Sequence, residues 1–219
     1  MVDLTKRCVV ILSGGPDSVT VAYWARAEGY EVHALTLNYS QKAQVEIQCA
    51  AEMASLLGAS HKIIDLSRLR DIYLGVTSLV DDGIDVTHEF TDPLIVPFRN
   101  GIFLSVAVAF AEGVGADMIL YGAHASDEPF YPDCRREFYE AFEVAASLGI
   151  GKRISIKSPF SDMPKSGVLR EAVRLGVPLN RTWSCYLGGP NHCGGCESCN
   201  NRKRAFIEAG VEDPTVYDG

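Results

Sequence analysis

A short polar segment near the N-terminus has the residue types of a phosphate-binding loop. It follows the apolar run Cys8-Val9-Val10-Ile11-Leu12, which predicts a buried strand, and it precedes a predicted helix. Its glycines allow backbone conformations that other residues avoid, and they let a ligand approach the main chain. The N-terminus of the following helix offers free N–H groups and the positive end of a dipole, which suits an anion. The segment therefore predicts an anion-binding loop made of Ser13, Gly14, Gly15, Pro16, Asp17 and Ser18.

Asp17 indicates how this loop would bind its anion. A carboxylate repels a bare phosphate, but Mg²⁺ placed between them takes oxygen ligands from both groups. Ser13 and Ser18 add hydroxyl donors. The loop is not a Walker A motif, which requires Gly-Lys-[Ser/Thr], and its spacing differs from the dinucleotide-binding fingerprint. The alternative interpretation is a glycine-rich turn in which Asp17 caps the helix.

Four of the seven cysteines lie close together near the C-terminus, with the spacing Cys185-x7-Cys193-x2-Cys196-x2-Cys199. Neighbouring glycines permit the tight turns that bring several thiolates to one centre. Four sulfurs complete the tetrahedral shell of Zn²⁺ and leave no position for a substrate water, so the pattern predicts a structural zinc site. An iron–sulfur cluster and disulfides or free thiols are the alternatives.

Two cations could neutralise phosphate charge. Arg99 follows Pro97 just before a predicted helix, and its planar guanidinium can donate to two phosphate oxygens. Lys165 follows the last predicted strand. The alternatives are a solvent-facing Arg99 beside a helix-capping Asn100, and a surface lysine at position 165. Further polar residues follow the second predicted strand, and Lys42 among them could equally be a solvated lysine at a helix start.

The loop from Tyr121 to Arg135 mixes aromatic side chains with carboxylates. Such a set suits a flat heterocycle with N–H groups on its edge, because aromatic rings pack on its faces and carboxylates accept hydrogen bonds from its edge. The alternative is a surface loop whose aromatic residues belong to the core. We assign no nucleophilic role to Cys134. The expected substrate-binding residues are Asp127, Phe130, Tyr131, Asp133 and Arg135.

The elements that position these residues alternate regularly. We predict strands at 8–12, 32–37, 61–66, 118–122 and 153–157, and helices at 17–28, 42–57, 100–112, 135–148 and 165–175. This alternation predicts an α/β fold with a doubly wound parallel sheet. Ligands of such sheets bind beyond the carboxyl ends of the strands, where the polar loops described above lie. The segment 74–97 shows no period, and a loop this long is usually functional or mobile.

Length and composition favour one globular domain with a small appended module. The chain has 219 residues, of which 47% are hydrophobic. We assign 1–180 to the main domain and 181–219 to a zinc-binding segment packed on it. No stretch reaches the roughly 20 apolar residues of a membrane span, and the N-terminal stretch shows no secretory segment. We therefore expect a cytoplasmic protein that does not bind membranes. The net charge of −8 argues against a nucleic-acid partner but permits a small anionic ligand.

The segment from Ser13 to Ser18 resembles the Ser-Gly-Gly-x-Asp-Ser loop of the ATP-pyrophosphatase (PP-loop) family, which binds the β,γ-pyrophosphate of ATP. Further motifs extend the resemblance over nearly the whole chain. Together, and in this order, they resemble the 7-cyano-7-deazaguanine synthase family (QueC, also called ExsB). These motifs are Gln41-Lys42 with Glu46, Val96-Pro97-Phe98-Arg99-Asn100, Tyr131-Pro132-Asp133-Cys134-Arg135, Lys165 and the four-cysteine tail.

The resemblance implies an adenine nucleotide alpha hydrolase-like fold and an ATP-dependent carbon–nitrogen ligase. In that family ATP adenylates 7-carboxy-7-deazaguanine, ammonia converts the adenylate to an amide, and a second activation followed by elimination gives the nitrile. The implied cofactors are structural Zn²⁺ and Mg²⁺, with ATP as co-substrate, and family precedent suggests a homodimer. The implied catalytic residues are Asp17, Arg99 and Lys165. The expected ATP site is the glycine loop with Leu37, Asn38, Gln41, Lys42 and Arg99, while Tyr131 and Asp133 would bind the deazaguanine and the four cysteines would bind zinc.

Two departures from the family pattern leave the acceptor of the activated carboxylate open. Glu128-Pro129-Phe130 replaces an aromatic-Ser-Gly stretch, and Ala43 stands where a histidine is expected. One alternative is therefore a QueC-like ligase that joins the activated deazaguanine to a protein amine. Another is a PP-loop tRNA sulfurtransferase, which would need a reactive cysteine pair and a basic surface. A third is a nucleotide-sensing or zinc-ribbon binding module without catalytic activity.

Overall fold

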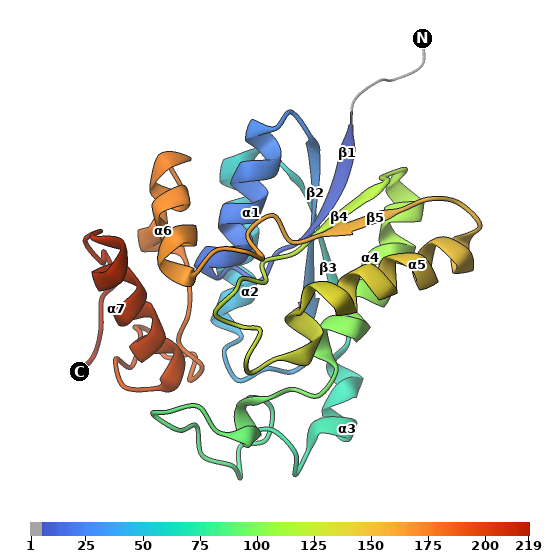
Figure 1. Ribbon diagram of the computed structural model, residues 1–219. Helices are drawn as coiled ribbons and strands as arrows, with labels where there is room; N and C mark the ends of the chain where they lie inside the picture. The colour runs from blue at the N-terminus through green and yellow to red at the C-terminus, as the bar shows by residue number, and fades with distance from the viewer. Residues whose placement is uncertain (1–5) are drawn as a thin grey trace.

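The computed structural model describes residues 6–219, so residues 1–5 of the N-terminal stretch discussed above lie outside the described part. Its centre is a five-stranded parallel sheet with the strand order β3-β2-β1-β4-β5 (Figure 1). The chain builds the sheet outward from β1 to β3 and then crosses to the other side of β1, so the topological switch point lies between β1 and β4. The strands are β1 (Arg7–Ile11), β2 (Glu31–Asn38), β3 (Ser60–Asp65), β4 (Met118–Leu120) and β5 (Ser155–Lys157).

Helices cover both faces of this sheet because its strands are apolar on both sides. In β1, Cys8 and Val10 belong to one hydrophobic cluster while Val9 belongs to another. Figure 1 shows α1, α2, α6 and α7 on one side of the sheet and α4 and α5 on the other. The helices are α1 (Pro16–Ala27), α2 (Val45–Leu57), α3 (Arg70–Tyr73), α4 (Arg99–Val114), α5 (Arg136–Ile150), α6 (Lys165–Arg174) and α7 (Glu197–Ala209).

The predicted fold class is confirmed, with two differences in the elements. The helix predicted from Lys42 begins only at Val45, since the backbone N–H of Lys42 donates to Leu79 O (2.8 Å) and holds this stretch as a turn. Helix α7 was not predicted. The irregular segment 74–98 has a single 3₁₀ turn, Asp92–Leu94, and it crosses the carboxyl end of the sheet below α2 and α4 in Figure 1.

Arg202 joins the C-terminal segment to the rest of the protein. Its side chain is buried, and its guanidinium donates to Leu179 O (2.9 Å), Thr182 Oγ1 (3.0 Å) and Ser184 Oγ (3.0 Å). A buried guanidinium needs such acceptors, because an unsatisfied charge in the interior is costly. Phe206 on the same helix belongs to the main core cluster. The segment 181–219 therefore packs on the rest of the chain, while the division at 180 stays a prediction.

One helical stretch among the described residues, Asp92–Val114, is long and apolar enough to cross a membrane by length and composition. Its central residues Leu104, Ala107 and Ala111 are fully buried against the sheet, as in the core helix of a globular domain.

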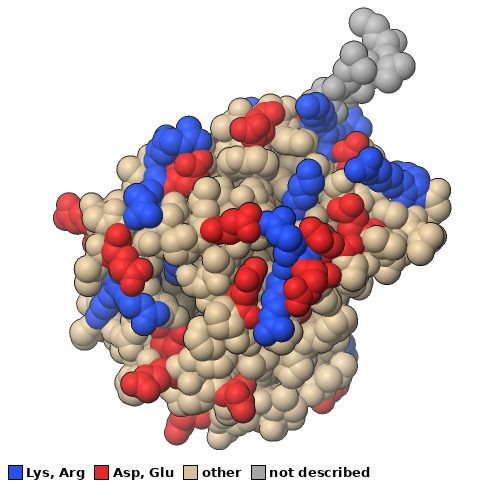
Figure 2. Space-filling model, viewed as in Figure 1, with Lys and Arg blue, Asp and Glu red and all other residues tan. Residues whose placement is uncertain are grey.

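The distribution of charged side chains over the surface is mixed. On the face shown in Figure 2, Lys and Arg side chains lie interspersed with Asp and Glu side chains.

Candidate active site

The glycine loop connects the end of β1 to α1 at the switch point of the sheet. Gly14 has a φ of +84°, and a Cβ atom there would lie 2.4 Å from Glu46 O on α2, so both the conformation and the close approach require glycine. Pro16 is the first residue of α1, where its missing N–H removes no helical hydrogen bond. Ser18 Oγ accepts from Ser13 N (3.1 Å) and lies 3.1 Å from Gly15 O, to which it donates. The loop is therefore fixed by its own serines around the N-terminus of α1.

Asp17 does not cap α1, contrary to the alternative considered from the sequence. The N-cap is Gly15, and the Asp17 carboxylate turns toward Lys165, whose Nζ lies 3.0 Å from Oδ2. Oδ1 of Asp17 lies 3.7 Å from His124 Nε2 and has no hydrogen-bond partner among the described residues, although it is buried. Burial raises the pKa of Asp17, but Lys165 and His124 outweigh it and hold the pKa well below its usual range.

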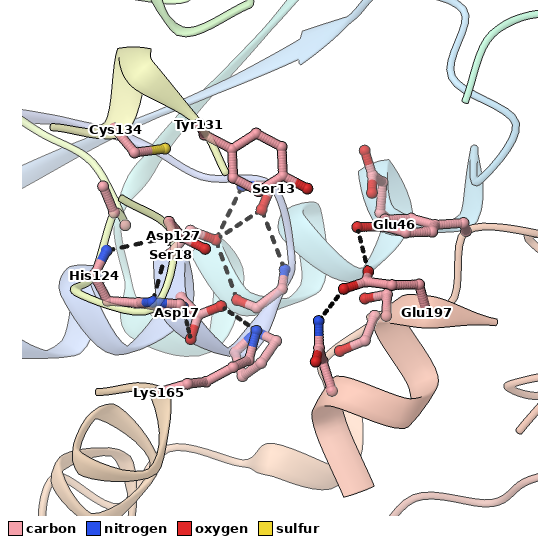
Figure 3. A pocket seen from close by; sticks show the side chains of 18 of the residues that line it. Ser13, Asp17, Ser18, Glu46, His124, Asp127, Tyr131, Cys134, Lys165 and Glu197 are labelled. Carbon is pink, nitrogen blue, oxygen red and sulfur yellow. Dashed lines mark hydrogen bonds and ion pairs between the residues drawn. The ribbon is translucent and has the colours of Figure 1, made fainter. Parts of the chain in front are cut away.

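The charges continue from Asp17 into the loop after β4. His124 Nδ1 lies 3.4 Å from Asp127 Oδ2, so the imidazole stands between two carboxylates (Figure 3). Burial lowers the pKa of Lys165, but Asp17 and Asp127 outweigh it and raise the pKa. Burial also raises the pKa of Asp127, against the opposing effects of His124 and Lys165. Lys165, Asp17, His124 and Asp127 thus lie in a row beside the glycine loop, and the sequence reasoning missed His124.

Arg99 begins α4 and reaches across to the end of β2. Its Nη1 donates to Tyr39 OH (3.2 Å), and its guanidinium carbon lies 5.9 Å from the centre of the Tyr39 ring. The preceding Phe98 adopts a left-handed φ of +56°, which turns the chain sharply into the helix. Asp133 stabilises this turn, because its Oδ2 accepts from Asn100 N (2.9 Å) in the first turn of α4. A carboxylate at a helix N-terminus is favoured by the helix dipole.

The segment after β2 brings one more carboxylate into the site. Gln41 Oε1 accepts from Tyr39 N (3.0 Å), and Gln41 Nε2 donates to Glu46 Oε1 (2.8 Å). Burial raises the pKa of Glu46 to about 7, although Gln41 and Arg99 lower it. Lys42 Nζ instead donates to Ile84 O (3.0 Å) in the segment 74–98. Lys42 therefore stabilises the position of the segment 74–98.

Aromatic side chains gather at the other end of the site. The Phe90 and Phe130 rings lie 4.5 Å apart, and the Tyr131 ring meets Phe90 edge-on at 5.7 Å. Tyr186 OH donates to Glu197 Oε2 (3.3 Å), and Asn201 Nδ2 donates to Glu197 Oε1 (Figure 3). Burial raises the pKa of Glu197, while Tyr186 lowers it. This end combines flat apolar surfaces with a buried carboxyl group, a combination that suits a heterocycle.

Most of these groups line one cavity of about 720 Å³. This volume lies within the range of small-molecule sites and is wide enough for a nucleotide beside a second small ligand. Five expected site residues lie outside its lining: Gly14, Asn38, Lys42, Asp133 and Arg135. The expected residues that line it are Ser13, Gly15, Pro16, Asp17, Ser18, Leu37, Gln41, Arg99, Asp127, Phe130, Tyr131 and Lys165.

Two residues that the sequence reasoning missed, Tyr186 and Glu197, directly follow the cysteines Cys185 and Cys196. That adjacency was the available signal. Arg135 has a local role instead, because its Nε donates to Glu128 O (3.1 Å) within its own loop.

The four clustered cysteines form a group that could bind a metal ion. Their Sγ atoms all lie within 4.8 Å of one another, and none of them forms a disulfide within residues 6–219. Backbone N–H groups point at the sulfurs, with Leu187 N and Cys193 N each 3.4 Å from Cys185 Sγ. Such donors stabilise thiolates, the form that binds metals. The donor set fits a tetrahedral metal with four sulfur ligands.

Comparisons with known proteins give one consistent result. A family model described as "Queuosine biosynthesis protein QueC" matches residues 7–210. A protein named 7-cyano-7-deazaguanine synthase from Caldicellulosiruptor bescii is 40% identical over 216 residues, covering 97% of each chain. A protein of the same name from Thermoplasma acidophilum is 42% identical over 223 residues, covering 97% of this chain and 92% of that protein.

Solved structures agree on the fold alone. NMN synthetase from Francisella tularensis superposes with a TM-score of 0.54 at 18% identity, covering 95% of this chain and 79% of that one. An NH3-dependent NAD synthetase from Campylobacter jejuni gives a TM-score of 0.52 at 18% identity, covering 82% and 68%.

Proposed function

This chain belongs to the QueC family, and from that premise we propose that it uses ATP to convert 7-carboxy-7-deazaguanine into 7-cyano-7-deazaguanine. The observation that carries the proposal is the single cavity with two chemically different ends. The glycine loop and Lys165 suit a polyphosphate at one end, and aromatic rings with Glu197 suit a heterocycle at the other. A carboxylate held between them would lie beside the α-phosphate of ATP.

The phosphate end would bind ATP through the N-terminus of α1. Ser13 and Ser18 offer hydroxyl groups, and Lys165 offers an ammonium group that Asp17 already orients. Asp17 also fits Mg²⁺, because its buried Oδ1 lacks a partner among the described residues, and the ion would supply positive charge to the phosphates. Arg99 lines the same cavity. These groups stabilise the charge that develops on the phosphoryl oxygens.

The reaction needs activation rather than a protein nucleophile. The substrate carboxylate attacks the α-phosphorus, pyrophosphate leaves, and an acyl adenylate forms. Ammonia attacks the acyl carbon, loses a proton and displaces AMP, which gives the amide. A second ATP adenylates the amide oxygen, pyrophosphate leaves, and the nitrogen loses one proton. Loss of the second N–H proton with departure of AMP then gives the nitrile. The protein contributes mainly by holding two anionic reactants in contact.

The cysteine cluster would hold Zn²⁺ in a structural role. Four thiolates leave no open position for substrate, and the cluster packs behind the cavity wall with Ala43 and Trp183. Family precedent also leads us to propose a cytoplasmic homodimer.

One observation favours a second acceptor of the activated carboxylate, a protein amine in place of ammonia. Phe130, which stands in the departure from the family pattern, is 45% exposed and pairs with Phe90. The exposed Phe130 ring beside the partly buried Phe90 could receive a peptide, so the candidate alternative is ligation of the activated deazaguanine to a protein amine. The sulfurtransferase alternative gains no such support, since the clustered cysteines suit a metal and the net charge is −8.

The decisive experiment is product analysis with the purified protein. ATP, Mg²⁺ and 7-carboxy-7-deazaguanine are incubated with ammonium, and AMP and the heterocycle are followed by chromatography and mass spectrometry. We expect AMP and pyrophosphate only when the heterocycle is present, with the amide followed by the nitrile. If the compound elicits no AMP, the substrate assignment is wrong. A product seen only with an added protein amine would favour the conjugating alternative.

A further inference from the structure

Glu197 is the buried carboxylate at the heterocycle end of the cavity. It is the first residue of α7, is only 8% exposed and lines the cavity. Tyr186 and Asn201 each donate to a different oxygen of this carboxylate. A carboxylate oxygen accepts more than one hydrogen bond, so both oxygens can still accept from a ligand.

Three other acidic groups at or near the cavity already have contacts elsewhere. Asp133 holds the first turn of α4, and Asp127 lies beside His124 at the phosphate end. Glu46 accepts from Gln41 on the first turn of α2, and its backbone oxygen lies against the glycine loop. Of these carboxylates, Glu197 is the one beside the aromatic group that contains Tyr131 and Tyr186.

The chemistry of the proposed substrate matches this position. The pyrimidine edge of a 7-deazaguanine carries a ring N–H and a 2-amino group, which are adjacent donors that point the same way. A carboxylate accepts from such a pair with both oxygens, and charge-assisted hydrogen bonds of this kind are stronger than neutral ones. The Tyr131 and Phe90 rings offer surfaces against which the flat ring system can pack.

We propose that Glu197 determines specificity by accepting hydrogen bonds from the ring N–H and the 2-amino group of the deazaguanine. This inference rests on the proposed function and names the residue that would recognise the heterocycle of the substrate. Tyr186 and Asn201 act as positioning residues, because they hold the two carboxylate oxygens in place.

The backbone around Glu197 is suited to such a role. Its N–H donates to Thr87 O (3.0 Å) in the segment 74–98, and the residue lies between the clustered cysteines Cys196 and Cys199. A recognition group on a well-supported element keeps its geometry better than one on a free loop. A metal bound by the cysteines would therefore fix the carboxylate that faces the substrate.

The test compares two substrates in four proteins. The substrates are 7-carboxy-7-deazaguanine and its counterpart without the 2-amino group. The proteins are wild type, Glu197→Gln, Glu46→Gln and Glu212→Gln. Glu212 is an exposed glutamate just beyond α7 and serves as the matched control. Steady-state AMP release gives kcat and KM for each combination of protein and substrate. ATP affinity and zinc content are measured separately.

Wild type should prefer the amino substrate by about 100-fold in kcat/KM, because the analogue leaves a buried acceptor unpaired. Glu197→Gln should raise the KM for the deazaguanine by about 10- to 100-fold, with ATP affinity and zinc content unchanged, and should lose most of the discrimination. Glu212→Gln should behave as wild type.

Unchanged KM and discrimination in Glu197→Gln would overturn the inference. It is also overturned if Glu46→Gln, and not Glu197→Gln, removes the discrimination. If wild type releases no AMP with the deazaguanine at all, it is the proposed function that fails. Should Glu197→Gln lose zinc or fail to fold, a crystal structure of wild type with the deazaguanine decides: hydrogen bonds from the ring edge to Glu197 support the inference, and a ring edge bound elsewhere overturns it.

Discussion

Lys165 Nζ lies 3.0 Å from Asp17 Oδ2, and this ion pair joins the first residue of α6 to the first turn of α1. Both side chains are largely buried, with exposed fractions of 22% and 19%. The two residues are far apart in the sequence, so the contact exists only because β5 brings α6 back beside β4 and the switch point. The pair therefore orients the Lys165 ammonium group and also connects distant parts of the chain.

Asp17→Ala should abolish AMP formation and also lower stability, because the Lys165 ammonium would stay buried without its partner. We expect a loss of about 1–3 kcal/mol in the free energy of unfolding, and the double variant Asp17→Ala/Lys165→Ala should recover part of it. Urea denaturation of the four proteins gives the coupling energy, and an AMP assay gives activity. Strictly additive losses would show that the pair contributes nothing to stability. Near-wild-type turnover in Asp17→Ala would remove Asp17 from the proposed mechanism.

Glu46 should make stability depend on pH in the neutral range. Burial raises its pKa from 4.5 to about 7, so the folded protein binds this proton more tightly than the unfolded chain does. The stability from this group is complete below pH 4.5 and is lost as the pH rises through about 7. Glu46→Gln stays neutral and can still accept from Gln41. Its stability relative to wild type should therefore increase between these values, by about 1–3 kcal/mol at the upper end.

The measurement is a series of urea unfolding curves for wild type and Glu46→Gln from pH 5 to pH 8. Taking the difference between the two proteins cancels the titration of every group they share. A difference that stays flat across this range would mean that Glu46 titrates at its ordinary pKa in the folded protein.

Removal of the metal should loosen the segment 74–98. Three hydrogen bonds join this segment to the cysteine cluster: Glu197 N to Thr87 O (3.0 Å), Asn200 Nδ2 to His88 O (3.0 Å), and a bond between His88 Nδ1 and Gly195 O (2.5 Å). Without a metal, repulsion between thiolates would spread the turns that carry these groups. Amide hydrogen exchange in 84–92 should therefore speed up after treatment with a zinc chelator.

The strand β4 (Met118–Leu120) is the internal control, because it lies in the sheet and should keep its slow exchange. Cys193→Ser should reproduce the effect without chelator. Equal protection of 84–92 in the metal-free and metal-loaded proteins would show that the cluster does not hold the segment.

Local patterns predicted the parts of the fold that depend on local sequence. The apolar run at 8–12 and the glycines after it identified the first strand and its loop, and the doubly wound class is confirmed. The QueC family is confirmed as well, and the four-cysteine spacing indicated a group that could bind a metal. The identities Zn²⁺ and Mg²⁺ and the roles of the site residues stay predictions.

Contacts between distant residues account for what sequence reasoning missed. Asp133 stands in the motif Tyr-Pro-Asp-Cys-Arg, yet its carboxylate accepts from Asn100 N at the start of α4. No local pattern in the sequence indicates that these two residues are in contact. Helix α7 begins inside the cysteine cluster, so its start resembled loop sequence, and its pocket-facing Glu197 was assigned no role. His124 lies within a short loop, and its place between Asp17 and Asp127 depends on the folded sheet.

Cys134 should be dispensable for catalysis even though it lines the cavity. Its side chain is buried, and burial together with Asp127 and Asp133 raises the pKa of the thiol well above its usual value. A thiol that stays protonated is a poor nucleophile. Asn100 Nδ2 lies 3.2 Å from Sγ and gives the sulfur a structural partner instead. Cys134→Ala should therefore keep AMP formation within about threefold of wild type and lose about 1 kcal/mol of stability from packing.

Alkylation of the native protein at pH 8, followed by peptide mass mapping, should leave Cys134 unmodified, with the more exposed Cys49 as the comparison. A folded Cys134→Ala protein without turnover, or rapid alkylation of Cys134, would instead indicate a reactive thiol and return the sulfur-transfer alternative to consideration.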